Sequence, residues 1–116
     1  MQSNKDIFEN CPVYAIQKII GGKWSFLVLY HLSTGTLRFG ELSRLMPMTT
    51  QSILTRELRN LENYHLINRK VYAEVPPKVE YSLTDIGKKF LPVLKELAQL
   101  GEDYKQCVKN IKSEKS

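Results

Sequence analysis

One predicted helix, between Thr49 and Asn63, places polar side chains suited to nucleic-acid binding on one side and leucines on the other. With about 100° of rotation per residue, the spacing separates the two sets. The polar side carries Ser52, Arg56, Arg59 and Asn63. The apolar side carries Leu54, Leu58 and Leu61. Hydroxyl, amide and guanidinium groups match the acceptors of base edges and phosphates, although an ordinary surface helix with a solvated polar side has the same pattern.

The first turns of this helix hold the side chains that we expect to contact DNA. They are Thr50, Gln51, Ser52, Thr55, Arg56 and Arg59. In such a role Gln51 can pair bidentately with adenine and Arg56 with guanine, each worth roughly 1–3 kcal/mol of base discrimination.

A net charge of +5, from 17 Lys plus Arg against 12 Asp plus Glu, is compatible with a polyanionic partner. We expect Arg38, Arg59 and Lys78 to meet phosphates. Lys23 and Arg69 are further candidates for backbone contacts, and each is equally compatible with a solvated surface charge.

The two cysteines, Cys11 and Cys107, are the other residues with distinctive chemistry. Cys11 directly precedes a predicted helix start at Pro12, where the free amides of the first turn stabilise a thiolate. One hypothesis is therefore a thiol switch that responds to an oxidant or a small electrophile. The alternative is a small buried side chain, as free cysteines commonly are. If Cys11 reacts, Cys107 is a candidate partner thiol across a dimer interface.

Other classes of protein are poorly supported. His31 and His65 are isolated, and no nucleophile, base and orienting group recur together, so we do not expect an enzyme. The chain has no zinc spacing and no glycine-rich phosphate loop, so no cofactor or metal is expected. No apolar run approaches the roughly 20 residues of a membrane-spanning helix, and the polar start predicts a cytoplasmic protein without a membrane partner.

Periodicity, prolines and glycines predict the elements that must position these residues. Helices are expected over 12–20, 23–34, 39–46, 49–63 and 84–110. The second is apolar almost all round and should be the central helix. Pro47 separates the third from the fourth by a tight turn, which is the pattern of a helix-turn-helix. Alternation on both sides of Val75-Pro76-Pro77 predicts a β-hairpin with a stiff, projecting tip, so the order is that of a winged helix.

The last predicted helix carries an apolar stripe that is too long for a domain of this size. The stripe runs through Ile86, Phe90, Leu94, Leu97, Gly101, Tyr104 and Val108. Together with the first helix it predicts a symmetric dimer, whereas the alternative is a helix that folds back over its own core. The expected interface residues are Val13, Ile16, Leu94, Leu97, Tyr104 and Val108. Pro92 should kink this helix, because it removes one backbone hydrogen bond.

Several spaced phrases carry a family resemblance. They are Cys11-Pro12-Val13, Gly21-Gly22-Lys23-Trp24, Arg38-Phe39 with Glu41-Leu42, and Glu74-Val75-Pro76-Pro77-Lys78-Val79-Glu80-Tyr81. From about Cys11 to Leu100 the chain resembles the HxlR-type winged helix-turn-helix transcriptional regulators of bacteria. The resemblance implies homodimeric DNA binding, with the helix from Thr50 as recognition helix, the hairpin as wing, and the first and last helices as dimer interface. It also implies that some relatives sense electrophiles or oxidants through the cysteine before the proline, here Cys11.

We therefore expect a mainly α fold with a small β-hairpin (α+β), a winged helix-turn-helix with N- and C-terminal dimerisation helices. Residues 1–10 are expected to form a polar arm, 11–108 the single domain and 109–116 a polar tail. The expected function is that of a sequence-specific repressor, which binds a palindromic operator in double-stranded DNA as a homodimer. The alternative is a winged helix that serves as a protein-interaction module without DNA binding.

Overall fold

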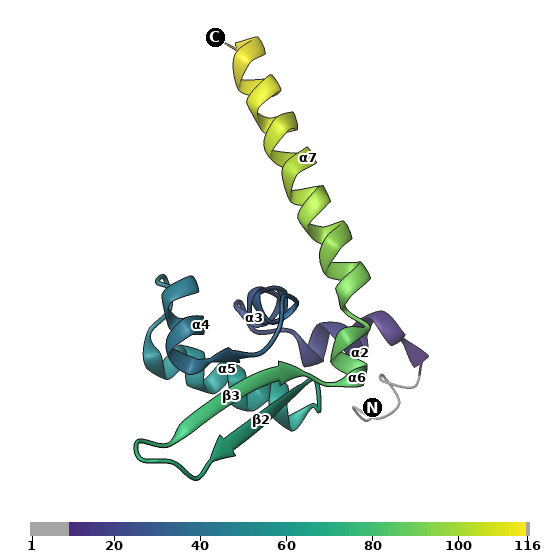
Figure 1. Ribbon diagram of the computed structural model, residues 1–116. Coiled ribbons are helices and arrows are strands. Elements are labelled where there is room, and N and C mark those ends of the chain that lie inside the picture. The colour runs from purple at the N-terminus through teal and green to yellow at the C-terminus, as the bar shows by residue number, and fades with distance from the viewer. Residues whose placement is uncertain (1–9, 116) are drawn as a thin grey trace.

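Residues 10–115 are described by the computed structural model, in which a small sheet lies along one edge of a group of helices and one long helix projects from the body (Figure 1). The predicted arm, residues 1–10, lies outside this range except for Asn10. The elements are α2 (Pro12–Ile19), α3 (Ser25–Leu32), β1 (Leu37–Arg38), α4 (Phe39–Leu45), α5 (Gln51–Asn63), β2 (Ile67–Tyr72), β3 (Lys78–Leu83), α6 (Asp85–Lys88) and α7 (Leu91–Lys115).

The core forms where α3 meets α4, α5, α7 and the sheet. Val28, Leu29 and Leu32 of α3 are at most 2% exposed, which confirms the prediction of a central helix. The leucine stripe of α5 packs against it, and Leu42 and Met46 belong to the same buried cluster. The winged helix-turn-helix is thus held together by one apolar core.

The sheet has three antiparallel strands in the order β1-β3-β2. The predicted hairpin is confirmed, and the short extended piece before α4 adds the third strand through Leu37 opposite Tyr81. Ile67 lies opposite Leu83, and Val75-Pro76-Pro77 lie in the turn that joins β2 to β3. Because the two prolines stay outside the ladder, no strand loses a hydrogen bond to them.

The end of the chain differs from the single helix predicted over 84–110. It forms α6, a break at Lys89 and Phe90, and then α7, which continues to Lys115. Pro92 is the second residue of α7, where its missing N–H has no helical partner to lose. The predicted kink inside one helix was therefore wrong, since the interruption precedes the proline.

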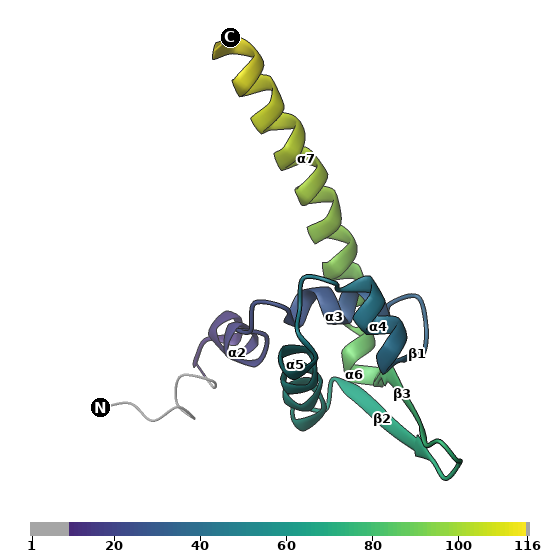
Figure 2. The same ribbon diagram turned by 90° about the vertical axis from the view of Figure 1, so that its left-hand side faces the viewer.

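Most of α7 extends away from the body, and only its first turns lie against it (Figures 1 and 2). Phe90 and Leu94 are buried at its base, whereas Leu100 and Tyr104 are exposed. Residues 109–115, expected to be a polar tail, continue the helix. Among the described residues, no helix combines the length and apolar character needed to cross a membrane.

Candidate nucleic-acid interface

Side-chain caps define both ends of the turn between α4 and α5. Thr49 Oγ1 donates to the carbonyl oxygen of Met46 at 2.8 Å, and Thr50 Oγ1 accepts from the amide of Ile53 at 3.1 Å. Thr50 is therefore the N-cap of α5. These contacts set where the exposed first turn of α5 begins.

The far end of α5 is closed by a backbone motif. His65 has a φ of 63°, in the left-handed region, and the amide of Leu66 donates to the carbonyl oxygen of Leu61 at 3.0 Å. The amide of His65 also donates to the carbonyl oxygen of Glu62 at 2.9 Å. Both bonds are those of a Schellman motif, which turns the chain sharply from α5 into β2.

The two predicted sides of α5 are present in the structure. Leu54, Leu58 and Leu61 are at most 1% exposed. The opposite side borders an open groove of about 490 Å³ lined by Gln51, Ser52, Thr55, Arg56 and Arg59. Five of the six predicted recognition residues thus line one surface, and the sixth, Thr50, caps the helix at its edge.

A second hollow joins α5 to the sheet. Arg69 of β2 and Arg59 of α5 both line it, together with Thr55, Glu62 and Tyr81. Arg69 pairs across the ladder with Tyr81, so it lies on the sheet face turned toward α5. The structure therefore brings Arg69 into the candidate surface and also places an acid there, Glu62, which was not among the predicted site residues.

The charged side chains of the wing contact an acid and an aromatic ring within the wing itself. Lys78 Nζ lies 3.3 Å from Glu80 Oε1 and 4.7 Å from the centroid of the Tyr72 ring. Lys70 Nζ lies 4.9 Å from the same ring centroid. The Tyr72 hydroxyl, followed by Lys78 and Arg38, holds the pKa of the Glu80 carboxyl below its ordinary value, while burial opposes the shift. Glu80 thus stays ionised and offsets part of the positive charge of Lys78.

Lys70, Tyr72 and Glu80 were not among the predicted site residues. They lie on the opposite sheet face from Tyr81, and the same period-two alternation that located the inward residues also marks this outward set.

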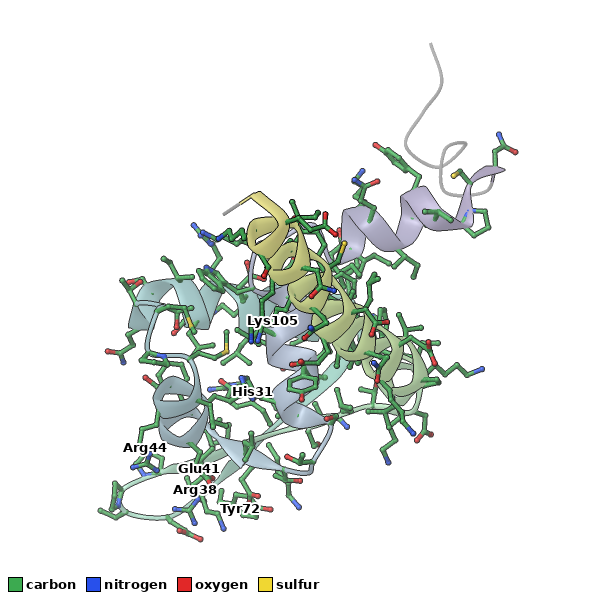
Figure 3. All side chains as sticks on the ribbon, turned by 90° about the horizontal axis from the view of Figure 1, so that it is seen from above. His31, Arg38, Glu41, Arg44, Tyr72 and Lys105 are labelled. Carbon is green, nitrogen blue, oxygen red and sulfur yellow. The ribbon has the colours of Figure 1, made fainter. Side chains whose placement is uncertain are left out.

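Arg38 connects the wing to the helix-turn-helix. It lines a hollow with Phe39, Gly40 and the tip residues 74–79, and its amide donates to Glu41 Oε1 at 3.0 Å. Seen from above, Arg38, Arg44 and Tyr72 lie on the same side of the molecule (Figure 3). Lys23 is separate from these residues, since its Nζ lies over the Trp24 ring at 4.9 Å and it lines none of the hollows described here.

Both cysteines are exposed and free in the protomer. Cys11 is the N-cap of α2, and its Sγ accepts from the amide of Tyr14 at 3.4 Å. The alternative expected a small buried side chain, and within the single chain Cys11 is not buried. Cys107 lies in the C-terminal half of α7.

The predicted dimer residues divide into two groups. Val13, Ile16, Leu97 and Tyr104 are 42–76% exposed, and Val108 is half-buried. Leu94 is 3% exposed and packs in the core, so little of its surface remains for a partner. The exposed apolar series on α7 instead runs through Val93, Leu97, Leu100, Tyr104 and Ile111, with Cys107 in the same spacing of four and three.

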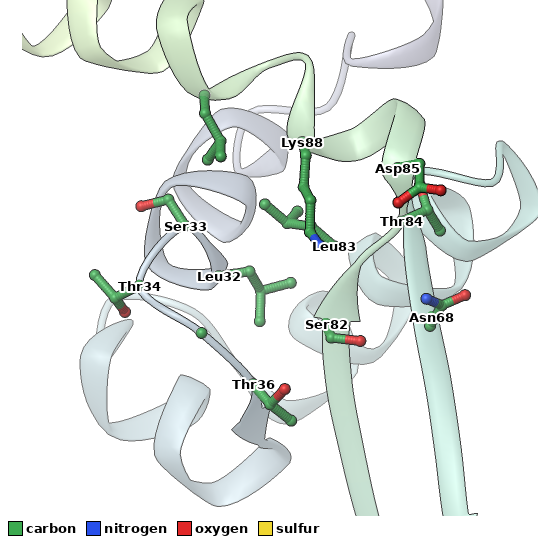
Figure 4. A pocket seen from close by; sticks show the side chains of 12 residues that line it. Leu32, Ser33, Thr34, Thr36, Asn68, Ser82, Leu83, Thr84, Asp85 and Lys88 are labelled. Carbon is green, nitrogen blue, oxygen red and sulfur yellow. The ribbon is translucent and has the colours of Figure 1, made fainter.

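A polar hollow of about 710 Å³ lies away from α5, between the end of α3, the ends of β2 and β3, and α6 (Figure 4). Hydroxyl groups and Lys88 line it, and none of the predicted site residues does. Among residues 10–115, no three His, Cys, Asp or Glu side chains are grouped closely enough to hold a metal ion.

Comparison with known proteins agrees with this geometry. A family model described as HxlR-like helix-turn-helix matches residues 19–109. The HTH-type transcriptional regulator YdeP of Bacillus subtilis (strain 168) is 46% identical over 110 residues, 95% of this chain and 86% of that protein. Among solved structures, the redox regulator HypR in its reduced form has a TM-score of 0.81 and 40% identity, over 86% of this chain and 99% of that one. Its oxidised form has a TM-score of 0.76 and 44% identity, over 80% and 96%.

Proposed function

The chain belongs to the HxlR-like helix-turn-helix family and is a DNA-binding transcriptional regulator; from that premise we propose that it is a homodimeric repressor of a palindromic operator. The observation that carries the proposal is the exposed polar side of α5, which begins at the Thr50 cap and has its leucines buried behind it. In helix-turn-helix proteins the N-terminal part of this helix enters the major groove.

In this role Gln51 and Arg56 read base edges, because amide and guanidinium groups form bidentate hydrogen bonds with adenine and guanine. Arg59 and Arg69 border the same surface from two elements and meet phosphates. Arg38 and Lys78 also meet phosphates, from the hollow that they line between the start of α4 and the tip of the wing.

The proposed dimer covers the apolar side chains that one protomer leaves in solvent. Val13 and Ile16 of α2 and Leu97 and Tyr104 of α7 are all at least 42% exposed. A two-fold dimer presents two α5 helices, so its operator has half-sites about one helical turn, or a multiple of it, apart.

The direct test is binding of the purified chain to its own upstream DNA in a salt titration. Neutralisation of about 6–10 phosphates lowers the affinity roughly 10³–10⁵-fold between 50 and 200 mM salt. Retention of a shifted duplex only at low salt, with preference for the upstream fragment over a scrambled duplex, supports the proposal. No binding to either duplex would contradict the proposed DNA binding and favour the protein-interaction module.

We further propose that Cys11 is a thiol switch, supported by its exposure at the N-cap of α2 and by the likeness to a protein described as a redox regulator. An oxidant such as diamide takes up the two hydrogens when two thiols become a disulfide. A cross-linked dimer on a non-reducing gel is expected for the wild type and its absence for Cys11→Ser. Equal loss of operator binding in both chains after diamide would leave Cys11 without this role.

A further inference from the structure

A buried acid lies on the recognition helix, between two of its exposed arginines. Glu57 is 7% exposed, while Arg56 and Arg59 on either side of it lie on the exposed side of α5. Burying a carboxylate is costly unless hydrogen bonds replace the lost water. Neither the leucine stripe nor the DNA-binding side of α5 accounts for this residue.

The partner of Glu57 is at the start of α3. Ser25 Oγ donates to Glu57 Oε2 at 2.9 Å, and Ser25 is itself 0% exposed. The residue before it, Trp24, caps α3 without a side-chain hydrogen bond. The carboxylate therefore lies near the amide end of α3, where a negative charge is stabilised.

Gly22 provides the room for this carboxylate. A Cβ added at Gly22 would lie 2.3 Å from Glu57 Oε1 and 2.6 Å from Oε2. The backbone of Gly22 is outside the left-handed region, so its φ does not demand a glycine. A glycine is required there because the Glu57 carboxylate occupies the space that a Cβ would need.

A second side chain of α5 makes a similar contact one turn later. Asn60 Nδ2 donates to the carbonyl oxygen of Ile19, the last residue of α2, at 3.3 Å. Glu57 and Asn60 thus attach the recognition helix to both sides of the α2–α3 connection. We call these contacts, from Glu57 to Ser25 and from Asn60 to Ile19, the α5 anchor.

We propose that Glu57 and Asn60 are positioning residues, which set the rotation and the axial position of α5 so that its polar side meets the base edges in register. The inference rests on the proposed DNA binding by that side. Apolar burial stabilises α5 but is not directional, whereas hydrogen bonds tolerate only a narrow range of distance and angle. The anchor also joins α5 to α2, the helix that Cys11 caps.

The test measures affinity for the upstream duplex and for a scrambled duplex, together with thermal unfolding of the full chain. Glu57→Ala should lower the affinity for the upstream duplex about tenfold or more, as expected for one lost charged hydrogen bond, and change the affinity for the scrambled duplex less than about twofold. Glu57→Gln keeps an acceptor for Ser25 and should restore most of the preference. Asn60→Ala should reduce the preference in the same direction and also serves where Glu57→Ala does not fold.

A double-mutant cycle isolates the contact at Gly22. Gly22→Ala should lower both stability and preference in the wild-type background and should have little effect in Glu57→Ala, where the obstructing carboxylate is gone. The positioning role alone is overturned if Gly22→Ala has an equal effect in both backgrounds. It is also overturned if Glu57→Ala leaves the preference for the upstream duplex unchanged. A wild-type chain that binds neither duplex overturns the proposed function and the positioning role together.

Discussion

Two helices of this chain, α5 and α7, have similar amphipathic sequences, but the apolar side is buried in α5 and largely exposed in α7. In α5 the leucines are at most 1% exposed and the polar side remains free. In α7, Leu100 and Tyr104 are 62% and 69% exposed, because the helix leaves the body after its first turns. An apolar stripe therefore predicts that a surface is covered, but it does not identify the element or molecule that covers it. The free polar side of α5 suits DNA, and the free apolar side of α7 suits a second copy.

The largest effect on stability should come from the covered side of α5. Leu58→Ala removes a 1% exposed side chain from the core and should lower the free energy of unfolding by about 2–5 kcal/mol. Chemical denaturation measures this change. The matched control is Leu100→Ala on α7, which should leave the stability of a dilute protomer within about 0.5 kcal/mol of the wild type. Equal losses at both positions would mean that α7 folds back over the body.

The free side of α7 should matter for assembly. Leu97→Asp places a charge in the exposed apolar series and should convert the dimer to a monomer in sedimentation experiments. Operator affinity should then fall by roughly 10²–10⁴-fold, because two linked half-site contacts become one. Gln106→Asp adds the same charge on the polar side of α7 and serves as the control. A Leu97→Asp chain that stays dimeric would move the interface away from α7.

The free side of α5 should matter for sequence preference. Arg56→Ala should weaken binding to the operator by about 1–3 kcal/mol while it changes binding to a scrambled duplex much less. Lys78→Ala should weaken both and reduce the salt slope by about one unit, because it removes one phosphate contact. Competition gel shifts at several salt concentrations separate the two patterns. If Arg56→Ala weakens both duplexes alike, Arg56 meets a phosphate rather than a base.

Local signals in the sequence were enough for most of the fold. Pro47 located the turn before α5, the leucine spacing predicted its buried side, and the two prolines marked the wing tip. Each of these depends on residues within a turn or two of one another, so no knowledge of distant contacts was needed.

Long-range packing explains what could not be predicted. Glu57 is buried because Ser25 and Gly22, more than thirty positions earlier, provide a donor and a space for it. Because α6 and α7 are separate helices, the predicted apolar stripe does not continue straight through Phe90. Leu94 therefore packs in the core, and a different apolar series of α7 is exposed. Spacing within one helix carries no information about either contact.

The smallest predicted effect tests where on α7 the partner approaches. A Cβ added at Gly101 meets nothing within 4 Å in the protomer, and the residue lies in the middle of a long helix. Gly101→Ala should therefore stabilise the chain by about 0.5–1 kcal/mol, because alanine loses less backbone freedom than glycine in a helix. Thermal unfolding at matched protein concentration measures it, with the monomeric Leu97→Asp chain as background control. If Gly101→Ala stabilises the monomer but destabilises the dimer, the backbone of the partner packs against Gly101. The interface would then be centred next to the exposed apolar series and not on it.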